Sequence, residues 1–157
     1  PAPSVRPEAP AGPHELVVEG VRVERWVEGQ LRLSAEAARA RADRRRGVLS
    51  AEGVALVARD ELGAPLGYLS SHALLADLAG AQVELRGDVV LEDTHGRTLT
   101  ATHAIYTSGD QRVVAPGRVQ VQGANFRAEG RRLRADLGPG LVEVDGPLSA
   151  RVQAKAP

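Results

Sequence analysis

Apolar and polar residues alternate one by one along much of the chain. The segments 118–122 (RVQVQ), 98–102 (TLTAT) and 142–145 (VEVD) place valine, leucine or alanine at every second position. Successive side chains of a β-strand point to opposite faces of the sheet, so a period of two is typical of antiparallel strands with one buried and one solvated face. The pattern predicts an all-β protein.

Glycines divide this pattern at nearly regular intervals. They occupy positions 20, 53, 87, 117 and 146, at spacings of 33, 34, 30 and 29 residues, and an apolar residue follows each within two positions. Turn-forming segments lie between the apolar runs, at 27–30 (VEGQ), 61–65 (ELGAP), 94–97 (THGR) and 108–111 (SGDQ). We interpret each unit as a strand that starts at the glycine, a short turn and a second strand. Strands that follow one another at roughly 8–12 residue spacing, with turn signals between them, indicate a sandwich, jelly roll or barrel.

Two stretches favour a helix by local propensity. Residues 34–46 (SAEAARARADRRR) and 71–80 (SHALLADLAG) are rich in alanine, and Ser34 and Gly47 could cap a helix. Both stretches nevertheless occupy the second-strand position of their units. Propensity is a weak prior, so we favour strands. The run Arg41–Arg46, with four arginines, could capture phosphate through guanidinium forks, although a solvated turn is the simpler interpretation.

Composition narrows the possible functions. The 157 residues contain 20 basic and 20 acidic side chains, 3% aromatic residues and no cysteine. A balanced charge and scarce aromatic residues do not favour a nucleic-acid surface. Without cysteine, disulfides and thiolate metal sites are excluded. We therefore expect no nucleic-acid partner and no cofactor.

The segment 87–117 holds two histidines and several acidic residues, which raises the question of catalysis or metal binding. His95 follows Asp93 by two positions, but the glycine at 96 indicates a hairpin turn rather than a ligand pair. The other histidines, at positions 14, 72 and 103, lack ligand spacing to one another. The serines at 70 and 71 adjoin His72 in sequence, yet neighbouring side chains of a strand point to opposite faces. We expect neither a metal site nor catalytic residues, and predict that the protein is not an enzyme.

The ends of the chain differ from its centre. Residues 1–13 contain five prolines, which favour an extended tether. The chain has no methionine, so we expect that a natural start has been removed. We divide the chain into a proline-rich linker at 1–15, a β-jelly-roll domain at 16–152 and a flexible tail at 153–157.

The order of these features resembles the LptC family, within the LptA/LptC/OstA-like proteins. Residues 87–136 carry the likeness: G-x-V-x-L is followed by G-x-x-L-x-T/A-x-x-A-x-Y, P-x-x-V-x-V and G-x-x-L-x-A-D. Residues 16–38 resemble the entry strands of the family. The alanine- and arginine-rich segment 34–46 and the scarcity of aromatic residues depart from it. The resemblance implies a twisted, boat-like antiparallel β-jelly roll that binds lipopolysaccharide in the periplasm, tethered to the inner membrane by an N-terminal helix absent from this chain.

The resemblance also implies partners. Such proteins accept lipopolysaccharide from an inner-membrane LptB/LptF/LptG-type ATP-binding-cassette transporter and pass it to an LptA-like jelly roll. A terminal strand has an unpaired edge that can add a partner strand. We expect the transporter at the N-terminal edge, near 16–27, and the LptA-like protein at the C-terminal edge, near 141–152, where Pro147 limits pairing. The alternatives are a soluble LptA-like bridge, a structural β-solenoid scaffold and, least favoured, a hydrolase.

If the two layers of such a fold splay apart, their apolar faces form a groove for acyl chains. We predict that ten side chains face it, although the same residues could equally fill a closed core. These residues are Val89, Leu91, Leu99, Ala101, Tyr106, Val119, Val121, Phe126, Leu133 and Ala135.

Overall fold

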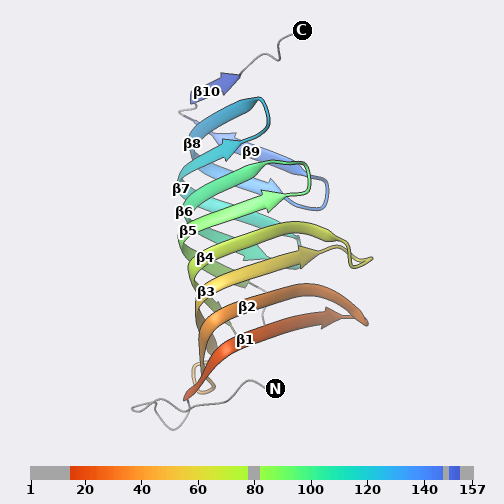
Figure 1. Ribbon diagram of the computed structural model, residues 1–157, viewed down its shortest axis with the longest axis vertical. Coiled ribbons are helices and arrows are strands. Elements are labelled where there is room, and N and C mark those ends of the chain that lie inside the picture. The colour runs from red at the N-terminus through yellow and green to blue at the C-terminus, as the bar shows by residue number, and fades with distance from the viewer. Residues whose placement is uncertain (1–14, 78–81, 147–148, 153–157) are drawn as a thin grey trace.

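The computed structural model describes residues 15–77, 82–146 and 149–152 and shows a single antiparallel sheet (Figure 1). Strands β1 to β8 follow one another as a meander, and both β9 and β10 pair with β8. No helix in these ranges is long and apolar enough to cross a membrane. The strands are β1 (Glu15–Val27), β2 (Gln30–Asp43), β3 (Val48–Arg59), β4 (Pro65–Asp77), β5 (Gln82–Asp93), β6 (Thr98–Thr107), β7 (Arg112–Gln122), β8 (Phe126–Asp136), β9 (Leu141–Asp145) and β10 (Ser149–Val152).

The predicted antiparallel all-β fold is confirmed, and the two helix-like stretches are strands. Residues 34–43 belong to β2 and residues 71–77 to β4, while 44–47 form a turn. Residues 78–80 lie outside the described ranges. β2 pairs with β1 and β3 along nearly its whole length. Two flanking strands satisfy its backbone groups, so tertiary pairing overrides the helix preference of alanine.

Four of the five regularly spaced glycines lie inside strands, so the expectation that they start the units was wrong, while Gly146 follows the end of β9. Gly20, Gly53, Gly87 and Gly117 occupy the middle of β1, β3, β5 and β7, with φ of 63°, 63°, 79° and 102°. Positive φ favours glycine because other residues meet a steric penalty from Cβ. The 30-to-34-residue spacing therefore marks every second strand at the position where it bends.

The bends form a crease that crosses the sheet. Next to the glycine positions, pairing shifts register between strands β4 and β5, β5 and β6, β6 and β7, and β7 and β8. Such bulges bend strands and increase their twist. The sheet folds along this crease, so its front half covers its rear half in Figure 1. Neighbouring strands are antiparallel throughout the described chain, in a folded meander rather than in the rungs of a solenoid.

The inner faces of the two halves form one hydrophobic core. Buried apolar residues come from strands β2 to β8, and Val17 of β1 is also fully buried. Tyr106 of β6 is the largest fully buried side chain, at 1% exposure. Burial raises the pKa of Tyr106 to about 12, although the positive charges of Arg32 and Arg25 act in the opposite direction. The core thus extends from β2 to β8, and the residues of β10 are exposed.

Candidate functional site: an apolar pocket at the first strands

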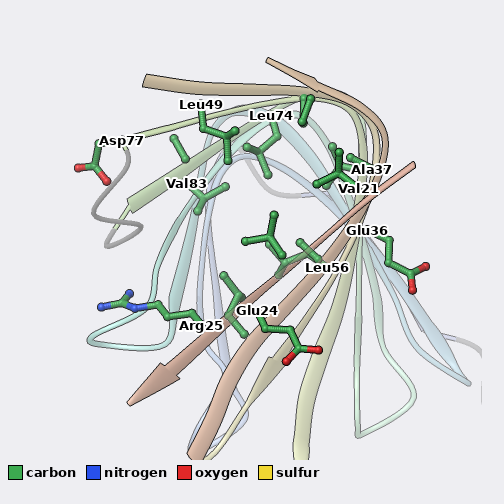
Figure 2. A pocket seen from close by; sticks show the side chains of 17 residues that line it. Val21, Glu24, Arg25, Glu36, Ala37, Leu49, Leu56, Leu74, Asp77 and Val83 are labelled. Atoms are coloured by element: carbon green, nitrogen blue, oxygen red, sulfur yellow. The ribbon is translucent and has the colours of Figure 1, made fainter. Parts of the chain in front are cut away.

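An apolar pocket of about 280 Å³ lies between the two layers at the β1 end of the molecule. Figure 2 shows apolar side chains gathered at its centre, while the charged ends of Glu24, Arg25, Glu36 and Asp77 point away from it. Ligand pockets are of about this size or larger, with mostly apolar walls and a few polar groups. The apolar lining consists of Val21, Val23, Leu33, Ala35, Ala37, Ala40, Leu49, Ala51, Val54, Leu56, Leu74, Ala76 and Val83.

Small side chains keep this pocket open. Ala35, Ala37 and Ala40 of β2 face it, and Ala51 of β3 stands directly opposite Ala40. A methyl group fills little of the space between two sheets packed about 10 Å apart. Val23, on the edge strand β1, is 41% exposed, so the pocket opens to solvent. The alanine-rich stretch that looked helical is thus one wall of the pocket.

The ten residues predicted to face a lipid groove lie elsewhere in the interior. Eight are buried in the core between β5 and β8, Ala101 is half-buried, and Phe126 is 37% exposed. None of them lines the pocket at β1. Contact of these residues with lipid therefore stays a prediction. The sequence analysis did not identify the pocket residues. The small side chains at alternate positions 35 and 37 could have indicated a strand that leaves space in the interior.

Three hydrogen bonds between strand ends and turns join the two layers of the sheet beyond the apolar pocket. Arg25 of β1 donates a hydrogen bond to Ser108 in the β6–β7 turn. Gln111 Nε2, in the same turn, donates to the backbone oxygen of Arg59 at 3.0 Å. Arg97 Nη2 donates to the backbone oxygen of Gly140 in the β8–β9 turn at 2.6 Å. We call these three contacts the seam. They join segments 43 to 83 residues apart and leave the β1 end as the open part of the interior.

Asp93 organises the turn at 94–97, as the sequence indicated. Its Oδ1 accepts the backbone N–H groups of His95 and Arg97, both at 2.9 Å, and its Oδ2 lies 2.5 Å from Arg97 Nε. Burial raises the pKa of Asp93, but these hydrogen bonds outweigh it and the net pKa is below the usual value. The carboxylate is therefore committed to the hairpin.

His103 and His72 each lie beside one carboxylate, and the Glu84 carboxylate also accepts a hydrogen bond from Arg86 Nε at 2.7 Å. His103 Nε2 lies 2.9 Å from Glu84 Oε1, and His72 Nε2 lies 3.3 Å from Asp88 Oδ2, with exposed side chains at the second pair. The buried Ser71 donates its hydroxyl to the Ala73 carbonyl rather than to His72. Within the described ranges, no three His, Cys, Asp or Glu side chains gather as metal ligands would. His14 lies outside these ranges.

The arginine run Arg41–Arg46 spans the end of β2 and the β2–β3 turn. Asp43 Oδ1 accepts the backbone N–H groups of Arg45 and Arg46, at 3.0 and 3.1 Å. The side chains of Arg44, Arg45 and Arg46 are exposed. This geometry is that of a solvated turn closed by an aspartate.

The fold is similar to that of a solved structure. The crystal structure of LptH, the LptA-homologous periplasmic component of the lipopolysaccharide transport device from Pseudomonas aeruginosa, superposes with a TM-score of 0.62 at 17% identity. The similarity covers 78% of this chain and 95% of LptH. It supports the jelly-roll architecture. No curated protein sequence matches the chain.

A family model describes nearly the whole sheet. The model for lipopolysaccharide-assembly proteins, LptC-related, matches residues 17–151. This range begins within β1, ends within β10 and includes every pocket residue. The chain therefore belongs to the LptC-related family of lipopolysaccharide-assembly proteins.

Proposed function

We propose that this protein is a periplasmic lipopolysaccharide-binding component of the export bridge. It takes lipopolysaccharide from the inner-membrane ATP-binding-cassette transporter and passes it to the next jelly roll, without breaking bonds. Membership of a lipopolysaccharide-assembly family supports the class of ligand. The observation that carries the proposal is the open apolar pocket at β1, because it offers fatty chains an interior that needs no unfolding of the core.

Burial of acyl chains would supply the binding free energy. Each methylene that leaves water for an apolar surface contributes about 0.8 kcal/mol. Valine, leucine and alanine walls offer such a surface, and the charged groups at the rim stay in solvent. In this proposal the pocket is the entry site, and the ten residues predicted from the sequence form the path further along the interior.

Photo-crosslinking tests where lipid enters. We expect a benzophenone amino acid at Val23 or Ala37 to capture lipopolysaccharide, since both positions line the pocket. The matched control is Leu75, which is exposed to a similar degree as Val23 (45% against 41%) but does not line the pocket. Capture at Val121 as well would extend the path into the core. Equal capture at Leu75 and Val23 would contradict the proposed entry site.

The two edges of the sheet are the proposed docking sites for protein partners. Among the described residues, β1 pairs only with β2, and β9 and β10 pair only with β8, so each terminal strand has one side without a partner strand in this part of the chain. An unpaired side presents backbone groups that a partner strand can bind. We assign the transporter to β1 and the next jelly roll to β9 and β10. Pro147 lies between these two strands, outside the described ranges.

Crosslinkers at exposed apolar residues can show which partner binds at which edge of the sheet. We expect Leu16 of β1, 43% exposed, to capture a transporter subunit, and Leu141 of β9, 50% exposed, to capture the next jelly roll. Leu62, 90% exposed in the β3–β4 turn, is the control for non-specific capture. Capture of the transporter at Leu141, or of the next jelly roll at Leu16, would contradict the assignment of the partners to the two edges.

A soluble LptA-like bridge is the second candidate, favoured by the structural similarity to LptH. Fractionation of the natural full-length protein distinguishes the two. Retention in the inner membrane after a high-salt wash supports a tethered component, and release with the periplasmic fraction supports a soluble bridge.

A further inference from the structure

We propose that Arg97 is a positioning residue for partner docking, because it anchors the start of the edge strand β9 to the opposite layer of the sheet. Arg97 ends the β5–β6 turn, and the backbone oxygen to which it donates belongs to Gly140, the residue before β9. We call the contact between these two turns the clasp. This inference rests on the proposed function and adds to it what holds the C-terminal docking edge in place.

Strand β9 has little support of its own. It contains five residues and, in the part of the chain that the structure describes, pairs only with β8. Leu141, Glu143 and Asp145 are exposed, and only Val142 and Val144 pack on the core. A short strand near a chain end with one neighbour opens easily. A partner strand would then have to order β9 again on binding, which weakens binding.

The clasp joins the two layers. Thr98, which follows Arg97, pairs with Gln122 at one end of β7, whereas Asp136 at the end of β8 pairs with Arg112 at the other end of β7. In a flat sheet the β5–β6 and β8–β9 turns would therefore lie a strand length apart. They meet because the sheet folds along the crease, so the clasp holds β9 from the far side of the interior.

The Arg97 guanidinium is held in a fixed direction. Its Nε lies 2.5 Å from Asp93 Oδ2, and its Nη2 donates to the Gly140 oxygen at 2.6 Å. The Asp93 side chain is 5% exposed, and its other oxygen accepts two backbone N–H groups of the same turn. The planar fork of arginine lets one side chain donate to both groups at once. The hairpin thus aims Nη2 at the start of β9.

Gly140 fits the clasp closely. Its φ of 72° is a conformation that favours glycine, because other residues meet a steric penalty from Cβ. A Cβ at this position would also lie 2.5 Å from His95 Cε1. The β5–β6 turn therefore packs against the backbone of the β8–β9 turn through His95 as well as through Arg97.

The β8–β9 turn closes without help from Arg97. The Gly140 N–H donates to the Asp136 oxygen at 3.0 Å, and the Leu137 N–H donates to the Gln111 oxygen at 2.9 Å. These bonds form the turn and continue the pairing of β7 with β8. The Arg97 bond instead ties the finished turn to the other layer, which is the contribution expected of a residue that positions β9.

Hydrogen exchange and partner binding together test the inference. We expect Arg97→Gln to exchange the backbone amides of 141–145 faster than the wild type. It should also bind a purified LptA-like jelly roll roughly fivefold more weakly, the factor that corresponds to one hydrogen bond of ordinary net strength. Capture of a transporter subunit at Leu16 should not change, because β1 is the other edge of the sheet. Arg97→Lys keeps a charge beside Asp93 but lacks the fork, so it should also lose affinity.

The matched control is Arg86→Gln. Arg86 Nη2 lies 2.5 Å from Glu84 Oε1 on the same strand, and its side chain is 68% exposed, so the variant removes the same charge and an ion pair without touching the clasp. We expect wild-type exchange and affinity for this control. Urea unfolding shows that each variant is folded.

The outcomes separate this inference from the proposed function. Wild-type exchange and affinity in both Arg97 variants would overturn the inference, as would equal effects of Arg86→Gln and Arg97→Gln. Equal loss of capture at Leu16 and Leu141 would show a general loss of structure and also overturn the positioning role. Failure of the wild type itself to bind the jelly roll would instead contradict the proposed docking edge, and the docking role of Arg97 with it.

Discussion

We expect the Ala37→Trp variant to bind lipopolysaccharide at least tenfold more weakly than the wild-type protein. Ala37 is half-buried on β2, and its methyl group lines the pocket. Because the strand fixes the direction of Cβ, the indole would occupy much of the cavity of about 280 Å³. Loss of room for two methylenes would already cost about 1.6 kcal/mol, from about 0.8 kcal/mol for each. Displacement of a fluorescent lipopolysaccharide measures the change.

The control for this variant is Ala55→Trp. Ala55 lies on β3 and is exposed on the opposite side of the sheet from the pocket-lining Val54 and Leu56. It carries the same change in side chain and hydrophobicity, so its affinity should equal that of the wild type. Equal affinity of Ala37→Trp and the wild type would contradict the pocket as the lipid site. Unfolding in urea should show both variants to be folded.

The Tyr106→Ala variant should lose about 3–5 kcal/mol of unfolding free energy, as large aromatic side chains do when deleted from a core. Tyr106 is 1% exposed and is the largest fully buried side chain in the described residues. Its removal leaves a cavity next to the seam, and the surrounding strands can collapse only partly. Urea unfolding followed by circular dichroism measures the change.

The chain has one other tyrosine, which provides the control. Tyr68 of β4 is 47% exposed, so Tyr68→Ala should cost less than about 1 kcal/mol. Similar losses for the two variants would show that the interior around Tyr106 is not a packed core. Such a result would favour a lipid path that extends from the pocket through the ten residues predicted from the sequence.

Part of this architecture was available from the sequence. Alternation at 98–102 and 118–122 predicts strands because side chains of a strand point to alternate faces, and glycine-containing segments such as 94–97 predict the turns between them. These rules are local, so they hold without knowledge of the partner strand. The same locality explains the error over Gly53 and Gly87: glycine serves a turn or a mid-strand bend equally well, and only the positive φ inside β3 and β5 distinguishes them.

The family resemblance predicted the class of ligand, but only the tertiary structure showed where the pocket lies. Residues 87–136 hold the repeated motif, whereas the pocket is lined by β1 to β4 and Val83. Both regions alternate in the same way, and alternation cannot show whether two faces meet closely or stay apart.

By itself, the sequence determined that the chain forms antiparallel strands with one apolar face each, and where most turns lie. Tertiary structure decided that 34–43 is a strand and that the sheet folds along a crease. The reason is physical: strand formation follows from the local period of side chains. The closure of one layer on another depends on the volumes of residues far apart in sequence, and on seam contacts such as that between Arg25 and Ser108.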